Sequence, residues 1–221
     1  MLAAIGEFLP LALGTALSPL PLIAIVFLVL SANGTGRSVG FMAGRLLGIA
    51  VMLTVLTFAA EAMPETRETT VLGGLIKILL GLGLVYVAVR KWRKRPQGET
   101  EPPMPGWVAG LDTISTPRAF GLGLLVTAIN PKELAFTLGA AISIGAAHQQ
   151  PGAIVVLGLL YVFIAGTTVL APVLMHLVAP ERAQSILGSA QRWLLRHQST
   201  VVGVVLLVLG VVLVSDGLTY L

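Results

Sequence analysis

The chain has 221 residues, of which 56% are hydrophobic and only 11% are charged, and its mean hydropathy is +0.92. Soluble domains carry about 25% charged residues, so this composition excludes an ordinary soluble protein and predicts an integral membrane protein. With a net charge of only +4, we expect no nucleic-acid partner. The chain has no cysteine, and its three histidines form no H-E-x-x-H pattern, so we expect no disulfide, no metal site and no cofactor.

Six apolar stretches are long enough to cross a hydrocarbon core of about 30 Å as helices. They cover residues 2–30, 39–60, 71–89, 119–147, 154–178 and 200–218. The first and fourth exceed the length that a span needs, and proline interrupts both. No basic residue precedes the first stretch, which is also too long for a signal peptide, so we expect it to remain in the protein.

The distribution of basic residues predicts how the spans are oriented. Ten Lys and Arg residues lie in the loops after the first, third and fifth stretches, and one lies on the opposite side. Because basic loops stay in the cytoplasm, both termini are predicted to lie outside it. A polar linker at residues 93–117 separates a first three-helix repeat, residues 1–92, from a second, residues 118–221. Three spans per half turn the second repeat upside down relative to the first.

The predicted fold class is therefore an all-α integral membrane protein with six transmembrane helices in two inverted three-helix repeats. Residues 180–198 add an amphipathic helix, since Ala183, Ile186, Leu187 and Ala190 recur at helical spacing opposite a basic face. Such a helix can lie in the headgroup plane on the cytoplasmic side. A surface linker helix is the alternative.

One phrase occurs twice in the chain. Thr15-Ala16-Leu17-Ser18-Pro19 returns 112 residues later as Thr127-Ala128-Ile129-Asn130-Pro131. Proline in a helix interior removes one hydrogen bond and clashes with the preceding turn. Helices broken at matching points of two half-chains indicate the binding site of a transporter. We therefore predict a substrate site that contains Thr15, Ser18, Pro19, Thr127, Asn130 and Pro131; two plain proline kinks are the alternative.

Three of the ionisable residues within the apolar spans are candidates for the site. Lys132 and Glu133 follow the second break, where a charge costs about 2.5–3.5 kcal/mol and indicates function. Lys132 is predicted to bind an anionic group of the substrate, and Glu133 to carry a proton or meet a cation; a structural ion pair is the alternative. Arg45, in the strip Gly40-x-x-x-Gly44-Arg45, is a further candidate for binding phosphate, sulfate or carboxylate. It is equally suited to reaching the headgroups.

Three segments resemble the GAP family, the sulfolipid- or glycopeptidolipid-addressing proteins of actinobacteria. They are LPLALGTALSPLPL at residues 9–22, GRLLG at residues 44–48 and AINPK at residues 128–132. The last two are shared more widely in the lysine-exporter (LysE) superfamily. The resemblance implies two three-helix repeats in the bacterial cytoplasmic membrane, and the movement of envelope glycolipids to the cell surface.

The favoured function is thus export of an amphipathic, anionic lipid or glycolipid by alternating access around the two broken helices. Export of a small solute, such as an amino acid or metal cation, is one alternative, and an accessory subunit of a lipid-export complex is another. No paired catalytic groups occur at one depth, so we do not expect an enzyme. The expected partners are membrane lipids, the substrate, and either a second copy of the chain or a lipid-export protein.

Overall fold

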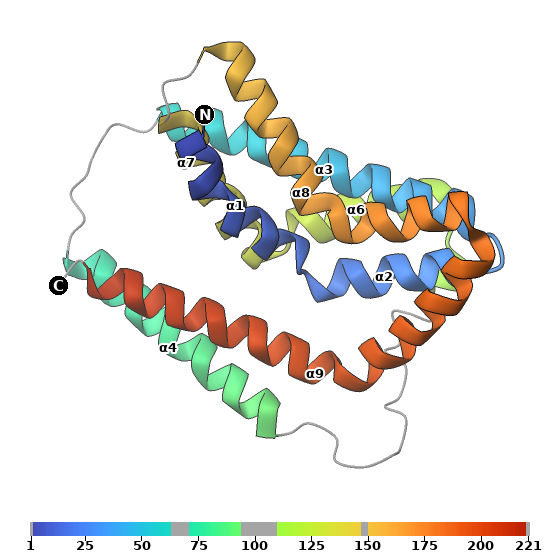
Figure 1. Cartoon of the computed structure of the whole chain (residues 1–221). Coiled ribbons are helices and arrows are strands. Elements are labelled where there is room, and N and C mark those ends of the chain that lie inside the picture. Colours follow the sequence, from blue (N-terminus) through green and yellow to red (C-terminus); the bar gives the residue numbers. More distant parts are fainter. Residues whose placement is uncertain (1, 63–70, 94–109, 147–149, 220–221) are drawn as a thin grey trace. The chain divides into compact units, whose positions relative to one another are not determined.

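The computed structural model describes residues 2–62, 71–93, 110–146 and 150–219. Every regular element in these ranges is helical (Figure 1). They are α1 (Leu2–Ala16), α2 (Pro19–Leu30), α3 (Gly34–Ala62), α4 (Val71–Arg93), the short η1 (Gly110–Asp112), α6 (Thr116–Ala128), α7 (Pro131–Ala146), α8 (Pro151–Val178) and α9 (Pro180–Leu218). The all-α prediction is therefore confirmed for the described part of the chain.

Both predicted interruptions are present as helix breaks. Pro19 begins α2 and Pro131 begins α7, positions at which proline is tolerated because the first helical N–H has no partner within the helix. The residue before a proline avoids the helical region, and Ser18 is extended, with φ −83° and ψ 115°. The axes of α1 and α2 differ by 53° across this break.

Two helices are long and apolar enough to cross a membrane, within Gly34–Ala59 and Pro151–Val178. The bent pair of α1 and α2 makes a third if it counts as one span. These assignments rest on length and composition in the described residues. The arrangement of six spans in inverted repeats stays a prediction.

The chain forms two compact units, each of which combines elements of both predicted halves. Unit 1 contains Met1–Met63 and Met104–Gln191, and unit 2 contains Pro64–Pro103 and Arg192–Leu221. The predicted amphipathic helix and the last predicted span form one continuous helix, α9. In the part of α9 that belongs to unit 1, Ala183 and Leu187 are buried, whereas Ile186 remains exposed.

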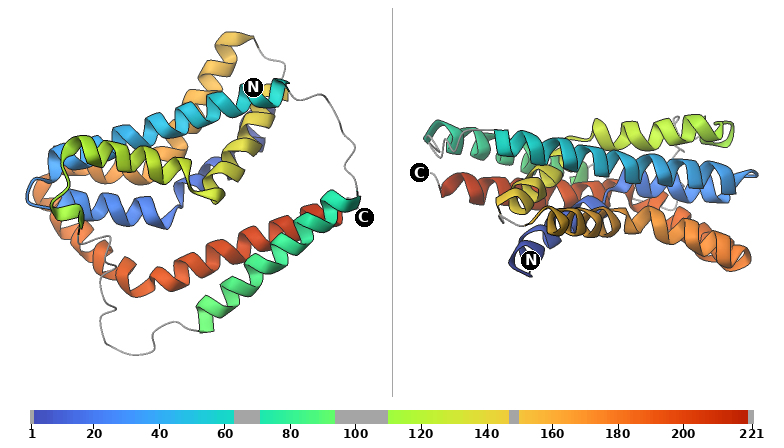
Figure 2. Two further views of the ribbon diagram at one scale, coloured as in Figure 1. Left: turned by 180° about the vertical axis from the view of Figure 1, so that it is seen from behind. Right: turned by 90° about the horizontal axis from the view of Figure 1, so that it is seen from above.

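In unit 1, α3 packs against α6, α7 and α8, and α1 packs against α7 and α8. Glycine permits the closest of these contacts, because a Cβ on Gly44 would overlap the carbonyl of Phe120, and one on Gly123 would overlap that of Phe41. Figure 2 shows α3 and α6 side by side. The backbones of α3 and α6 therefore approach each other as closely as small residues permit. Arg45 lies directly at this contact.

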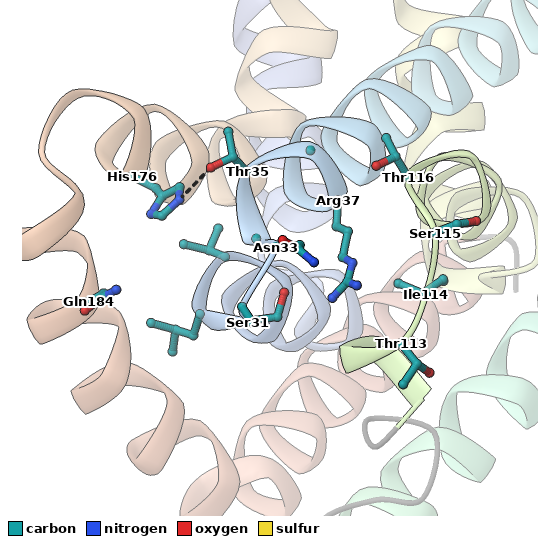
Figure 3. Close-up of a pocket in the computed structure, with 15 residues that line it drawn as sticks. Ser31, Asn33, Thr35, Arg37, Thr113, Ile114, Ser115, Thr116, His176 and Gln184 are labelled. Carbon is teal, nitrogen blue, oxygen red and sulfur yellow. Dashed lines mark hydrogen bonds between the residues drawn. The ribbon is translucent and has the colours of Figure 1, made fainter.

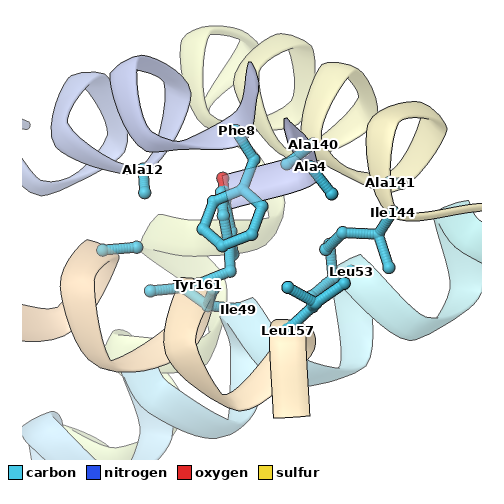
Figure 4. Packing of buried hydrophobic residues seen from close by; sticks show 11 residues of the cluster. Ala4, Phe8, Ala12, Ile49, Leu53, Ala140, Ala141, Ile144, Leu157 and Tyr161 are labelled. Carbon is cyan, nitrogen blue, oxygen red and sulfur yellow. The ribbon is translucent and has the colours of Figure 1, made fainter. Parts of the chain in front are cut away.

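The apolar core of unit 1 lies between α1, α3, α7 and α8. Phe8 of α1 and Tyr161 of α8 meet edge to face, with ring centroids 6.0 Å apart (Figure 4). Both rings are fully buried. The surrounding side chains are small or aliphatic: Ala4, Ala12, Ile49, Leu53, Ala140, Ala141, Ile144, Leu157 and Ala165.

Unit 2 consists of α4 and the part of α9 from Arg192 onward. Glycines line their contact, since a Cβ on Gly81 would lie 2.7 Å from the carbonyl oxygen of Gly210. A Cβ on Gly217 would lie 2.8 Å from that of Gly74. The third predicted span of each half thus packs on the other through its small residues.

Candidate functional site

The two helix breaks meet inside unit 1. Asn130 Nδ2 donates a hydrogen bond of 3.2 Å to Ser18 Oγ. These residues hold the same position in the two copies of the repeated phrase. Thr15 and Thr127 also correspond, and each hydroxyl bonds the carbonyl four residues earlier, that of Leu11 and that of Gly123, at 3.0 Å. The sequence-predicted polar residues of both breaks therefore form one cluster.

A fully buried ion pair lies at this meeting point. Nη1 of Arg45 is 3.0 Å and 2.9 Å from the two carboxylate oxygens of Glu133, and both side chains are 0% exposed. Asn130 Nδ2 reaches the same carboxylate at 3.3 Å, and Nη1 of Arg45 lies 3.4 Å from Thr127 Oγ1. Glu133 occupies the first turn of α7, where the helix dipole favours a negative charge.

Side chains from three other helices satisfy the carbonyls that end α1. Pro19 and Pro21 have no N–H, so the carbonyls four residues before them, those of Thr15 and Leu17, lose their helical partners. Arg45 Nη2 donates to the Thr15 carbonyl at 3.4 Å, and Lys132 Nζ donates to that of Leu17 at 3.2 Å. Thr168 Oγ1 of α8 donates to the carbonyl between them, that of Ala16, at 2.7 Å. The two cations thus replace the donors that the two prolines lack.

The start of α7 is capped from within the second break. Asn130 Oδ1 accepts a hydrogen bond of 3.2 Å from the backbone N–H of Lys132, the interaction expected of a helix N-cap. Asn130 therefore serves three partners at once: the α7 backbone, Ser18 of the other break, and Glu133 of the ion pair. Its substitution should disturb all three.

A family model described as "Sap, sulfolipid-1-addressing protein" matches residues 8–219 of this chain. The chain belongs to this family. The match confirms the GAP-family resemblance, while membership of the lysine-exporter superfamily stays a prediction. Neither the curated proteins nor the solved structures gave a match. Together with its apolar helices, the match identifies a helical membrane protein.

Sequence reasoning missed Thr137 and Thr168 of the cluster and, above all, Tyr161. Its hydroxyl lies 3.0 Å from Thr15 Oγ1 of α1 and 3.0 Å from Thr137 Oγ1 of α7. Tyr161 is fully buried, and a buried phenol needs a hydrogen-bond partner. A lone tyrosine in the apolar stretch 154–178 was the available signal, but it does not say which helices supply the partners.

The cationic side chains of the cluster differ in how far they are exposed. Lys132 is half-buried, and its ammonium lies 5.6 Å from the ring centroid of Phe136. Arg45 does not extend to the headgroups, because it is fully buried and bound to Glu133. Its Nε atom is buried and has no hydrogen-bond partner in the described structure. In the described ranges no three His, Cys, Asp or Glu side chains are grouped as a metal site requires.

Two apolar hollows lie in unit 1. One, of about 590 Å³, lies between α3, α6 and α7, and its wall includes Ala128, Ile129 and Leu134 around the second break. The other, of about 570 Å³, lies between α3, α7 and α8, and most of its lining is apolar, including Leu53, Phe58 and Ile144. Both volumes lie in the range of small-molecule sites, about 300–1,000 Å³.

Proposed function

We propose that this protein exports an amphipathic, anionic lipid or glycolipid across the bacterial cytoplasmic membrane. The observation that carries the proposal is the contact between the two breaks, through Ser18 and Asn130, beside the buried Arg45–Glu133 pair. Ionisable groups inside a membrane are expensive and are placed where they act on a substrate or an ion. The family's description names a sulfolipid, which is an amphiphile of this class.

In this proposal six spans form two inverted repeats that rock around the cluster. Repeat-equivalent residues meet at the axis of such an arrangement, and the contact between Ser18 and Asn130 has this character. The chemistry is not symmetric, however. Lys132 and Glu133 of the second repeat correspond to Leu20 and Pro21 of the first. One half therefore supplies the charges that follow the break, while the other lacks them.

In this proposal the guanidinium of Arg45 exchanges one anion for another. The first is the carboxylate of Glu133, and the second is the headgroup of the cargo. Glu133 neutralises Arg45 in the structure described here. A proton on Glu133 removes that negative charge, and the guanidinium then takes the phosphate or sulfate group of the cargo in its place. Lys132, half-buried on the Leu17 carbonyl, is the second cation for the same group. The cargo crosses chemically unchanged, and an ion gradient supplies the energy.

The apolar hollow beside the second break supports a cargo that has acyl chains. Its wall includes Gly48 of α3, Gly121 of α6 and Leu134 of α7, so an acyl chain placed there would keep its headgroup near the polar cluster. A small hydrophilic solute would have no use for such a wall. This feature favours a lipid over an amino acid or a metal cation.

Reconstitution tests the proposal directly. The purified protein is placed in phosphatidylcholine vesicles with a trace of fluorescent phosphatidylglycerol, and dithionite reports how much probe reaches the outer leaflet. We expect the wild type to move the probe, and Lys132→Ala and Glu133→Gln to slow this movement at least tenfold. Glu181→Gln is the matched control, because Glu181 is exposed at the start of α9 and outside the cluster. Gel filtration confirms that each variant is folded.

Three results would contradict the proposal. Probe movement that both cluster variants leave unchanged would remove the role of the breaks. Efflux of trapped amino acids or divalent cations without lipid movement would establish the small-solute alternative. Lipid movement that requires a second membrane protein would establish an accessory subunit.

A further inference from the structure

A polar pocket lies at one end of unit 1, separate from the two breaks. Its volume is about 780 Å³. Its walls come from the turn between α2 and α3, the segment that leads into α6, the last turns of α8 and the first turns of α9 (Figure 3). Four segments far apart in sequence thus surround one space, and the central cluster uses none of the residues that line it.

The lining of the pocket is rich in hydrogen-bond donors and carries positive charge. Arg37 is its charged residue, and no Asp or Glu occurs among the lining residues that the structure describes. Figure 3 shows the guanidinium of Arg37 between the α2–α3 turn and Ile114. Arginine has five N–H donors in a planar fork, so Arg37 can bind an anion alongside its other contacts. Hydroxyl and amide groups surround it: Ser31, Asn33, Thr35, Thr113, Ser115 and Thr116.

Backbone groups add to this preference for anions. The helices α3 and α6 both begin at the pocket, at Gly34 and Thr116, and the first N–H groups of a helix have no partner within it. Ser115, the N-cap of α6, makes no side-chain capping bond. Helix starts attract negative groups, and here they flank a cavity that already contains an arginine.

His176 connects the α8 wall to the α3 wall. Its Nε2 lies 3.1 Å from Thr35 Oγ1 (Figure 3). Its Nδ1 is buried and has no partner within the described part of the chain. The imidazole therefore holds the end of α8 beside the start of α3 and retains one unused polar atom at the rim of the pocket.

We propose that this pocket binds the phosphate or sulfate headgroup of an anionic amphiphile before the amphiphile reaches the broken helices. Small-molecule sites occupy about 300–1,000 Å³, and a cavity of about 780 Å³ holds a headgroup with its glycerol or sugar rather than a bare anion. The distribution of Lys and Arg residues predicts that the end of unit 1 with this pocket faces the cytoplasm. The role as a loading site rests on the proposed function, whereas the binding itself does not.

Direct binding to the full-length protein tests the proposal. The protein is held in phosphatidylcholine nanodiscs and titrated by calorimetry with dihexanoyl phosphatidic acid, a soluble amphiphile with a phosphate monoester. We expect saturable binding to the wild type and at least tenfold weaker binding to Arg37→Gln. Arg118→Gln is the charge-matched control, because Arg118 is exposed near the start of α6 but does not line the pocket; it should bind within twofold of the wild type.

A second variant tests the cavity without a change of charge. Gln184 is exposed on the α9 wall, so Gln184→Trp should fold and should fill part of the pocket from that wall. We expect it to weaken the binding of dihexanoyl phosphatidic acid at least fivefold. Dihexanoyl phosphatidylcholine, inorganic phosphate and inorganic sulfate are the comparison probes, and each should bind more weakly than the phosphatidic acid.

The outcomes separate the pocket from the proposed transport. No binding to the wild type, or equal binding to Arg37→Gln and Gln184→Trp, would overturn the site. Inorganic phosphate that binds as tightly as the lipid would overturn the headgroup assignment in favour of a free anion. Glu133→Gln should bind the probe normally even though it fails in the vesicle assay. If Arg37→Gln left the KM for lipid movement unchanged, the loading role would be overturned. A wild-type protein that binds the probe but does not transport lipid would refute only the proposed function.

Discussion

Ser18 and Asn130 are hydrogen-bonded to each other at 3.2 Å, although 112 residues separate them. The same separation relates the two copies of the repeated phrase, so the repeat places equivalent residues in contact. Each follows a helix that proline ends, and each lies where hydrogen-bonding groups would otherwise lack partners. Variants of this contact and of its neighbours can therefore test both the stability of the site and its role in lipid movement.

A double-mutant cycle measures this contact. Ser18→Ala removes the acceptor and should lower the free energy of unfolding by about 1 kcal/mol. Asn130→Ala should lower it by about 2 kcal/mol, because the α7 cap and a bond to Glu133 are lost as well. The double variant should be more stable than the sum predicts, by about 0.5–1 kcal/mol. Unfolding in mixed detergent micelles gives these values. Additive losses would show that the Ser18 hydroxyl and the Asn130 amide do not interact.

The ion pair allows stability and activity to be separated. Arg45→Gln or Glu133→Gln leaves one charge buried without its partner, and each should destabilise the protein by about 3–5 kcal/mol. The apolar double variant Arg45→Met/Glu133→Leu should recover most of this loss. It should remain about 1–3 kcal/mol below the wild type, because the Thr15 carbonyl still lacks its donor.

The vesicle assay then decides whether that pair acts on the cargo. We expect the apolar double variant to be folded yet unable to move fluorescent phosphatidylglycerol. Transport at the wild-type rate by this variant would reduce the pair to a structural element, and the exchange of Glu133 for the cargo would have to be abandoned.

The approach of α3 to α6 depends on glycine at defined positions. A methyl group on Gly44 or Gly123 would overlap a backbone carbonyl of the opposite helix, so Gly44→Ala and Gly123→Ala should each destabilise the protein by about 3 kcal/mol. Gly121 lies on α6, like Gly123, but a Cβ there would meet open space. Gly121→Ala should therefore be neutral or stabilising by about 0.5 kcal/mol. Thermal unfolding of the three variants checks the contrast. Equal losses at Gly121 and Gly123 would contradict this packing.

The hydroxyl of Tyr161 connects α8 to α1 and α7. Tyr161→Phe keeps the ring contact with Phe8 but removes bonds to Thr15 and Thr137, so the free energy of unfolding should fall by about 1–2 kcal/mol. Tyr86→Phe is the control, since Tyr86 is 67% exposed on α4 and its replacement should change little. The two variants are compared by unfolding in mixed micelles, where similar effects would count against the buried role of Tyr161.

Local chemistry explains why the breaks could be located from the sequence. Proline removes a donor wherever it stands, but Pro10 and Pro172 lie within α1 and α8. The repeated phrase is what singled out Pro19 and Pro131 as the positions of the breaks. The apolar composition likewise predicts the class of protein, because an apolar stretch of this length is suited to span a membrane whatever the order of its residues. The repeated phrase placed Thr15, Ser18, Thr127 and Asn130 in one prediction, and these residues do lie together.

Only the tertiary structure decided which groups complete the cluster. Arg45 and Glu133 are 88 residues apart, and Tyr161 and Thr168 come from another helix again. A helix that is apolar on all sides has no polar stripe to show which face meets which neighbour. The glycines of α3 and α6, together with the prolines that turn the chain, set those faces. They determine that the guanidinium of Arg45 lies on Glu133 rather than at the membrane surface.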